Sequence, residues 1–336
     1  MPSPIPRATV IGDGAMGTLC ALLLAQHGTE VTLWGRSPDH VAELNRAREN
    51  KRYLPGHRFP DSLRLSSDEA SAFDGASVIV SAVPCQFTRS IWQRLADHVP
   101  VAVPIVSVAK GIEVDTLMRP TDIIRECAGA KSVACLSGPS IAPEIADGKP
   151  ASVVVAATDP DFARRIQLGF STSFFRVYTS DDLLGIELAG AVKNVVAIAA
   201  GICDGIRAGD NAKASLITRG LVEITRLGTA MGALPDTFRG LAGIGDLITT
   251  CISGIGRNRS AGERIGQGMT ADEVIAATPS VIEGIPTTRS VLELAAKHGV
   301  EMPIVSGVAS VLFDGKSPSE AIEALMTRPL RGEAPW

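Results

Sequence analysis

The sequence predicts an α/β protein in which an N-terminal doubly wound sheet is followed by a C-terminal all-helical domain. Up to about residue 180, short β-branched runs alternate with amphipathic segments, a pattern typical of a parallel sheet covered on both faces by helices. The strand signal then stops, and the pattern to about residue 330 is helical with glycine-rich breaks. A chain of 336 residues is long enough for two domains, which we place at residues 1–182 and 183–336.

The first domain is expected to begin with two strand–helix pairs. The strands are predicted at residues 7–12 and 30–34, and the helices at residues 15–27 and 38–50. Further β-branched runs predict strands at residues 76–83, 103–109, 131–136, 151–157 and 173–180.

Composition narrows the classes of function. The formal net charge is −4 and aromatic residues are 4%, so the chain lacks the basic, aromatic-rich surface expected of a nucleic-acid-binding protein. The six cysteines have no CxxC spacing and the five histidines no HExxH spacing, so we expect no metal site and a reducing compartment. The opening residues run into a strand without the pattern of a signal peptide, which predicts a cytoplasmic protein.

The best candidate for a membrane helix is the apolar stretch "LAGAVKNVVAIAAG", residues 188–201. Glu187, Lys193 and Asp204 interrupt it or border it. We therefore predict a segment that is too short and too polar to span a bilayer, and no stable membrane insertion.

The stretch "VIGDGAMG" connects the first predicted strand to the first predicted helix. It places Gly12, Gly14 and Gly17 in the spacing GxGxxG. Such glycines allow a tight turn, the approach of a pyrophosphate to the backbone, and close packing of helix on strand. Directly after the first strand of an alternating chain, this pattern predicts a Rossmann-type dinucleotide-binding domain.

The residues after the second strand bear on the choice of dinucleotide. An acidic residue there would favour NAD by binding the ribose 2′-hydroxyl, but this chain has Gly35 and Arg36. Because an arginine suits the 2′-phosphate of NADP, we expect NADP(H) to be favoured, with NAD(H) as the alternative. An exposed loop arginine is the competing interpretation.

Two further loops follow predicted strands. "VSVAKGIE" places Lys110 after one, and "CLSGPSIAPEI" places Gly138 and Ser140 after another. Ligands of open α/β sheets bind beyond the carboxyl ends of the strands, so these residues are candidates for a site that holds an anion. Taken singly, each has a structural alternative, namely a loop lysine and a serine that caps a helix.

Lys193 lies in the middle of the most apolar predicted helix. Burying an unpaired ammonium group is costly, so such a group is usually paired, neutralised or used in chemistry. Burial, together with a second cation such as Lys110, would lower its pKa into a useful acid–base range. Asp246 is a candidate partner, and it shares a face with Thr250 if that segment is helical. A lysine that snorkels or forms a structural pair is the alternative.

The stretch "GRNR" presents a guanidinium next to an amide. Arg257 and Asn258 suit a phosphate group, which a guanidinium binds through two parallel hydrogen bonds. Further along, "VIEG" carries Glu283, whose role the pattern does not define.

The ordered set "GDGAMG", "VAKGIE", "SGPS", "GAVKNVVAIAAG", "DGIRAGDNAKA", "GIGDLITTC", "GRNR" and "VIEG" resembles the soluble NAD(P)-dependent glycerol-3-phosphate dehydrogenases, in particular the bacterial biosynthetic type. The resemblance covers nearly the whole chain. It implies reversible reduction of dihydroxyacetone phosphate to sn-glycerol 3-phosphate for phospholipid synthesis, with Lys193 as proton donor and acceptor. It implies small molecules as partners and is compatible with a homodimer.

The resemblance also implies roles for individual positions. The implied catalytic residues are Lys193, Lys110 and Asp246. The implied substrate-binding residues are Lys110, Gly138, Ser140, Lys193, Asp246, Gly256, Arg257 and Asn258. The implied cofactor-binding residues are Gly12, Gly14, Ala15, Met16, Gly17, Arg36, Lys110, Ala142, Arg257, Val281 and Glu283. The family often has a serine and an aromatic residue at Ala15 and Met16, a lysine at Pro143 and a serine at Gly256, and these departures concern affinity and cofactor preference.

Two other functions compete with this one. A β-hydroxyacid dehydrogenase also combines a Rossmann domain, a helical domain and a lysine, but such enzymes commonly space lysine and asparagine one helical turn apart, whereas Lys193 and Asn194 are adjacent. A dinucleotide-binding sensor without catalysis would not need the set of lysine, aspartate and arginine residues found here.

Overall fold

The computed structural model describes residues 4–330 and 332, and the chain forms two compact units. The N-terminal unit comprises the chain up to Ala109 together with Pro120–Leu183. The C-terminal unit comprises Lys110–Arg119 and the chain from Leu184 onward. We expected a single division between residues 182 and 183. The structure adds an exchange of chain, because the ten-residue segment Lys110–Arg119 belongs to the C-terminal unit.

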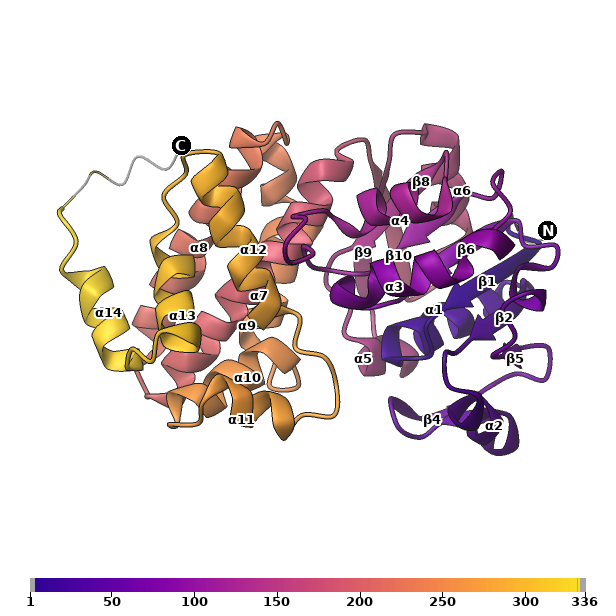
Figure 1. Ribbon diagram of the computed structural model, residues 1–336, viewed down its shortest axis with the longest axis horizontal. Helices are drawn as coiled ribbons and strands as arrows, with labels where there is room; N and C mark the ends of the chain where they lie inside the picture. The colour runs from indigo at the N-terminus through magenta and orange to yellow at the C-terminus, as the bar shows by residue number, and fades with distance from the viewer. Residues whose placement is uncertain (1–3, 331, 333–336) are drawn as a thin grey trace. The chain divides into compact units, whose positions relative to one another are not determined.

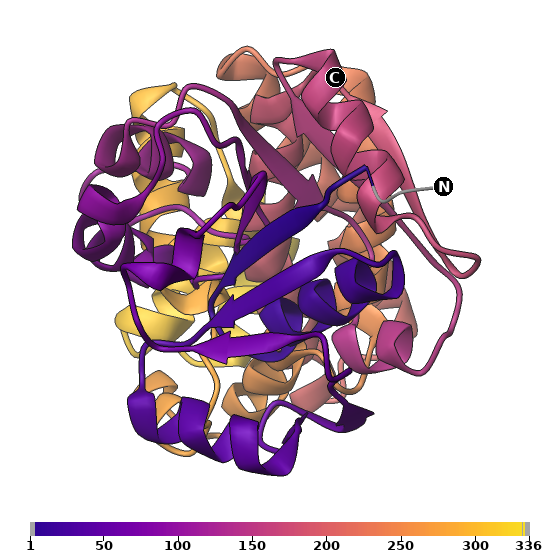
Figure 2. The ribbon, with the colours of Figure 1, turned by 90° about the vertical axis from the view of Figure 1, so that its right-hand side faces the viewer.

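The N-terminal unit contains an eight-stranded sheet with the order β10-β9-β8-β7-β6-β1-β2-β5 (Figures 1 and 2). Its strands are β1 (Arg7–Ile11), β2 (Glu30–Trp34), β5 (Arg64–Ser66), β6 (Val78–Ser81), β7 (Ile105–Ser107), β8 (Val133–Ser137), β9 (Ala151–Ala157) and β10 (Phe175–Ser180). The predicted α/β class is confirmed, and β5 is a strand that the sequence patterns did not indicate.

The expectation of a wholly parallel sheet is wrong for the last two strands. β9 runs antiparallel to β8, and β10 is parallel to β9. The element between β8 and β9 is α5 (Ala142–Ala146), whose five residues extend roughly 7.5 Å at 1.5 Å per residue. The five-residue strand β8 spans about 17 Å, so this helix is too short to carry the chain back for a parallel crossover.

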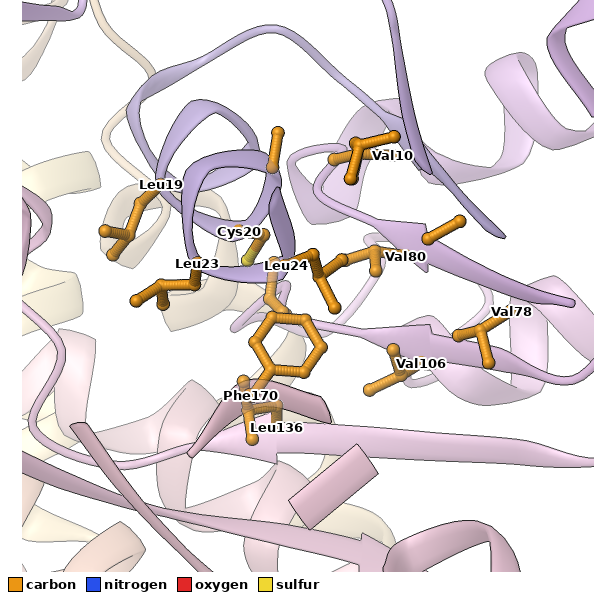
Figure 3. Packing of buried hydrophobic residues seen from close by; sticks show 14 of the residues in the cluster. Val10, Leu19, Cys20, Leu23, Leu24, Val78, Val80, Val106, Leu136 and Phe170 are labelled. Atoms are coloured by element: carbon orange, nitrogen blue, oxygen red, sulfur yellow. The ribbon is translucent and has the colours of Figure 1, made fainter. Parts of the chain in front are cut away.

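Helices pack on the sheet of the N-terminal unit. They are α1 (Ala15–Gln26), α2 (Pro38–Ala47), α3 (Cys85–Leu95), α4 (Pro120–Ala128), α5 and α6 (Pro160–Phe170). Helix α1 contacts α5 and α6, whereas α3 contacts α4. Figure 3 shows the core beneath α1, where Leu24 and Phe170 lie near Val80 and Val106 of the strands. This packing fixes the start of α1, and with it the glycine loop.

The predicted helix at residues 38–50 is wrong in its last turn. Helix α2 ends at Ala47, because Arg48 adopts a left-handed conformation with φ of 51°. The following residues form β3 (Glu49–Asn50), which pairs antiparallel with β4 (Leu54–Arg58). Asn50 is consequently fully buried.

The regular elements described in the C-terminal unit are all helices, as expected. The α-helices are α7 (Leu183–Gly205), α8 (Asp210–Ala230), α9 (Asp246–Ile252), α10 (Arg257–Gly266), α11 (Ala271–Ala276), α12 (Gly284–Lys297), α13 (Pro303–Phe313) and α14 (Pro318–Met326) (Figure 1). A short stretch of wider helical turns, Leu241–Gly245, leads directly into α9.

Helix α7 is the central element of this unit. Its 23 residues are long and apolar enough to cross a membrane, so the prediction that the segment is too short and too polar is wrong. Its apolar surface is instead buried inside the unit, where Val192, Val195, Val196 and Ile198 have no exposed surface. The protein core provides the apolar surroundings that this helix requires.

Helices α7 and α10 approach each other through glycines. A Cβ on Gly201 would lie 1.9 Å from the Arg259 carbonyl oxygen, and a Cβ on Gly262 would lie 2.0 Å from the Ile198 carbonyl oxygen. Only glycine permits backbone contact this close. The start of α10, with Arg257 beside Asn258, is thereby fixed against the helix that carries Lys193.

Candidate functional site

The glycine loop of the N-terminal unit has the geometry of a phosphate cradle. Gly12 has a φ of +107°, and a Cβ there would lie 2.8 Å from the carbonyl oxygen of Ala82. A Cβ on Gly17 would lie 1.8 Å from the carbonyl oxygen of Gly12. At Gly14, by contrast, no atom of the described residues beyond its chain neighbours lies within 4 Å of the Cβ position. The loop is tight where helix and strand meet, and open at Gly14.

The start of α1 suits an anion. Gly14 is its N-cap and supplies no side chain, and within the described chain no side chain caps this end or adds an acid to the first turn. The N–H groups and the positive end of the helix dipole are therefore available to a ligand. The arrangement fits the pyrophosphate of a dinucleotide.

A residue that the sequence patterns did not indicate supports this loop. The buried amide of Asn50 donates from Nδ2 to the Asp13 carbonyl oxygen and to Thr18 Oγ1, both at 2.8 Å. Asn50 thus ties the loop and the first turn of α1 to the β3–β4 hairpin. No local pattern indicated this, because the contact joins segments far apart in the sequence.

The residues implied for cofactor binding lie around this loop in different environments. Ala15 and Met16, in the first turn of α1, pack partly buried against the core of the N-terminal unit. Arg36 is exposed after the end of β2, where Gly35 donates its backbone N–H to the Ser66 carbonyl oxygen at 3.0 Å.

The loop after β8 lies at the same edge of the sheet as the glycine loop, because β1, β6, β7 and β8 are parallel. Gly138 has a φ of +135°, and a Cβ there would lie 3.0 Å from Val153 Cα. Ser140 Oγ donates to the Gly138 carbonyl oxygen at 3.0 Å, and Ala142 is the first residue of α5. The serine is therefore not the N-cap of α5, whose N-cap residue is Ile141.

Lys193 has charged and polar partners within the C-terminal unit. Its side chain is 6% exposed, and Nζ lies 3.0 Å from Asp246 Oδ1. Nζ also donates to Thr250 Oγ1 at 2.5 Å. Thr250 in turn donates to the Asp246 carbonyl oxygen, one turn back on α9, at 2.6 Å. The ammonium group is held by Asp246 and Thr250, which lie on one face of α9.

Asp246 binds a second lysine. Lys110 Nζ donates to Asp246 Oδ2 at 2.7 Å, so the two oxygens of one carboxylate hold two ammonium groups. Burial acts to raise the pKa of Asp246, but the two lysines outweigh it, and its pKa lies below the ordinary value. The cluster carries a net charge of +1 when both lysines are protonated, which suits an anionic substrate.

The pKa of Lys193 is shifted in the direction expected from the sequence. This pKa is lowered to about 8; burial is the main cause, Lys110 acts in the same direction, and Asp246 acts in the opposite direction. An ammonium group with a pKa near the working pH is suited to both donating and accepting a proton.

Two buried amides connect this cluster to the start of α10. Asn194 donates from Nδ2 to the Lys110 carbonyl oxygen at 3.2 Å and accepts from Asn258 Nδ2 at 2.9 Å. Asn258 Oδ1 accepts from the backbone N–H of Gly284 at 2.9 Å. Both side chains are almost fully buried. Asn258 therefore links α7, α10 and α12, a contact that its position beside Arg257 did not indicate.

The remaining implied residues lie near the start of α10. Gly256 is its N-cap and provides no side chain. The exposed Arg257 donates from Nη1 to the Val281 carbonyl oxygen at 2.9 Å. Glu283 is buried two residues further along. Arg257 is thus held on one side by the "VIEG" segment.

The implied site residues form two groups, one in each unit. The N-terminal group comprises Gly12, Gly14, Ala15, Met16, Gly17, Arg36, Gly138, Ser140 and Ala142. The C-terminal group comprises Lys110, Lys193, Asp246, Gly256, Arg257, Asn258, Val281 and Glu283. Among residues 4–330 and 332, no three His, Cys, Asp or Glu side chains gather as they would around a metal ion.

Comparison with known proteins assigns this chain to a family. Residues 7–163 match the model of the NAD-dependent glycerol-3-phosphate dehydrogenase N-terminus, and residues 182–323 match that of its C-terminus. The chain belongs to the NAD-dependent glycerol-3-phosphate dehydrogenase family. The resemblance stated from the motifs is confirmed.

Individual relatives are similar over nearly their full length. The glycerol-3-phosphate dehydrogenase [NAD(P)+] of Geobacter sp. (strain M21) is 47% identical over 97% of this chain and 98% of its own. That of Chlorobium phaeobacteroides (strain BS1) is 48% identical over 97% and 99%. The crystal structure of glycerol-3-phosphate dehydrogenase from Coxiella burnetii superposes with a TM-score of 0.93 at 36% identity, covering 97% of this chain and 100% of that one.

Proposed function

We propose that this protein interconverts dihydroxyacetone phosphate and sn-glycerol 3-phosphate with NAD(P)H as the reductant. The observation that carries the proposal is the cluster of the buried Lys193 and Asp246 with the partly buried Lys110 in a chain of this family. A lysine that is paired by a carboxylate but still has a pKa of about 8 suits a reaction in which a ketone oxygen gains a proton.

The proposed chemistry divides between the cofactor and the chain. The reduced nicotinamide supplies a hydride to the C2 ketone. Lys193 donates a proton to the C2 oxygen during reduction and takes it back during oxidation. Asp246 and Thr250 hold the ammonium group, and burial, with a smaller contribution from the charge of Lys110, keeps its pKa low.

The phosphate of the substrate is proposed to bind to Arg257, with Gly256 at the start of α10 and the positive charge of Lys110 contributing. Gly138 and Ser140 are proposed as further substrate contacts. Binding this non-reacting group holds the ketone in position for hydride transfer. The role of Asn258 in this proposal is to fix the position of Arg257, because its amide already bridges Asn194 and Gly284.

The glycine loop is proposed to hold the dinucleotide, with NADP(H) favoured over NAD(H). Arg36 is exposed after β2, where a guanidinium can form charge-assisted hydrogen bonds with a 2′-phosphate. The further cofactor contacts in this proposal are Ala15, Met16, Lys110, Ala142, Arg257, Val281 and Glu283.

The location and the metabolic role belong to the same proposal. A cytoplasmic enzyme that supplies a precursor for phospholipid synthesis, assembled as a homodimer, is proposed on the family resemblance. Light scattering of the purified protein measures the assembly, and a mass of about two chains is expected.

The direct test is a spectrophotometric assay of NADPH and NADH oxidation with dihydroxyacetone phosphate. A 3-keto carboxylic acid serves as the comparison substrate. We expect turnover with the phosphate-bearing ketone and little with the carboxylate. Preference for the carboxylate would favour a β-hydroxyacid dehydrogenase, and tight cofactor binding without turnover of any ketone would favour a sensor.

A further inference from the structure

The end of β2 carries an acidic group that comes from another part of the chain. In dinucleotide-binding sheets of this kind, a carboxylate at the end of the second strand binds the 2′-hydroxyl of the adenosine ribose. Here β2 ends at Trp34 and is followed by Gly35, which has no side chain. The space that a side chain would use is taken by Asp13 and Val41, because a Cβ on Gly35 would lie 2.3 Å from Asp13 Oδ2 and 2.8 Å from Val41 Cγ2.

Asp13 is held in place by the loop that bears it. It lies between Gly12 and Gly14 in the glycine loop, and its carbonyl oxygen accepts the hydrogen bond from Asn50 Nδ2 at 2.8 Å. Its side chain is 21% exposed, so a ligand can reach part of this side chain. Asp13 therefore has a fixed backbone and a partly exposed side chain.

Titratable and charged groups surround this carboxylate. His40 Nε2 is buried 3.8 Å from Asp13 Oδ2, and it has no hydrogen-bond partner among the residues that the structure describes. Burial raises the pKa of Asp13, while His40, the backbone amide, Arg36 and Arg52 act in the opposite direction. The carboxylate of Asp13 thus has an imidazole nitrogen close by and feels the charges of Arg36 and Arg52.

We propose that Asp13 replaces the missing acid at the end of β2 and sets how strongly the protein distinguishes an adenosine 2′-hydroxyl from an adenosine 2′-phosphate. The inference rests on the proposed function, because it requires dinucleotide binding at the glycine loop. A carboxylate accepts a hydrogen bond from a hydroxyl group but repels a phosphate dianion, whereas Arg36 attracts the dianion. Asp13 weakens the preference for NADPH that Arg36 alone would give, so that the protein uses NADH as well as NADPH.

The test measures binding of two fragments that lack the nicotinamide. Adenosine 2′,5′-bisphosphate and 5′-AMP are titrated into the full-length protein by isothermal calorimetry, and the ratio of their Kd values is compared between variants. We expect Asp13→Asn to shift this ratio toward the 2′-phosphate by about tenfold or more, because one repulsion is removed and one charged hydrogen bond is weakened. Asp61→Asn removes an exposed charge in the same unit and should leave the ratio within about twofold.

A second variant moves the carboxylate without removing it. The methyl group of Gly35→Ala would displace Asp13 Oδ2 and also press on the apolar Val41 Cγ2, so the same direction of shift is expected with the charge retained. Thermal unfolding of both variants shows whether they are folded. If Asp13→Asn does not fold, the test is made with Gly35→Ala alone.

Equal changes in both Kd values, or no change in either, would show that Asp13 only shapes the loop, and would overturn the inference while leaving the proposed function intact. If the unmutated protein binds neither fragment, nor NADPH or NADH, the cofactor part of the proposed function fails and the inference fails with it.

Discussion

Lys193 Nζ and Asp246 Oδ1 form a buried ion pair 3.0 Å long between the middle of α7 and the first residue of α9. The other oxygen of the same carboxylate holds Lys110. One negative charge therefore serves two positive charges, and the neutral form of Lys193 is less costly here than it would be in a simple pair. Burial is the main reason why this paired lysine still has a lowered pKa, and the charge of Lys110 adds to that shift.

Replacing Lys193 with methionine tests its role in proton transfer. Lys193→Met keeps most of the bulk and removes the titratable group, so we expect kcat to fall at least ~100-fold with NADPH binding unchanged. The measurements are steady-state turnover and the Kd for NADPH. Lys297→Met, an exposed lysine in the last turn of α12, is the control and should keep full activity. Normal turnover by a folded Lys193→Met protein would exclude the lysine from the mechanism.

The pH dependence of turnover follows from the same group. Because the pKa of Lys193 is about 8, its protonated fraction falls as pH rises through that value. Reduction of the ketone requires the protonated form, so kcat/KM for reduction should decline above about pH 8, whereas kcat/KM for oxidation should rise. Rate profiles measured in both directions from pH 6 to 10 test this, and flat profiles would contradict it.

The stability of the fold should also depend on this lysine. Its pKa is about 8 in the folded protein against an ordinary value of 10.5, so between these values the unfolded chain binds more protons. Stability relative to Lys193→Met should therefore rise as pH increases from about 8 to 10.5. Urea unfolding of both proteins at several pH values measures the difference, and a difference that does not change with pH would contradict the pKa shift.

Removing the shared carboxylate should destabilise the protein strongly. Asp246→Asn leaves the buried ammonium group of Lys193 and the partly buried one of Lys110 without their counter-charge, and breaking a buried pair such as Lys193–Asp246 costs ~3–5 kcal/mol. The loss should be smaller in the double variant with Lys193→Met, and smaller above pH 8, where Lys193 releases its proton. Asp236→Asn removes an 88% exposed carboxylate and should change the unfolding free energy by less than about 0.5 kcal/mol. Equal losses in the two single variants would contradict the account of the cluster.

The sequence predicts those features of the fold that depend on short, regular patterns. The glycine loop after β1, the alternation of strands and helices, and the helical second half all follow from local spacing. The β3–β4 hairpin does not, because the residue that follows α2 in a left-handed conformation is Arg48 and not a glycine. The direction of β9 depends on the length of α5, and the boundaries of so short a helix are not evident from its sequence.

The candidate site also combines residues that local sequence patterns indicate with residues that they do not. Lys193 and Asp246 are recognisable because a charge in an apolar helix requires a partner. The bridge from Asn194 to Asn258 and the position of Asp13 beside Gly35 are not, because each joins residues that only tertiary packing brings together. A glycine such as Gly35 does not show, in the sequence, which distant side chain fills the space beside it.

The last prediction tests the class of substrate through Arg257. This exposed guanidinium is held by the Val281 carbonyl oxygen and is proposed to bind the substrate phosphate through charge-assisted hydrogen bonds, worth ~1.5–3 kcal/mol. Arg257→Ala should therefore lower kcat/KM for dihydroxyacetone phosphate by about 10- to 150-fold at saturating NADPH. Dihydroxyacetone lacks the phosphate, so its poor turnover should change much less.

Arg239→Ala, which removes an exposed guanidinium from the same unit, is the matched control and should affect neither substrate. The comparison requires saturating cofactor because Arg257 is also a proposed cofactor contact. Equal losses for the two ketones in Arg257→Ala would show that the arginine serves the cofactor or the fold. The phosphate would then have to bind to another group, and Lys110 beside Asp246 is the next candidate to substitute.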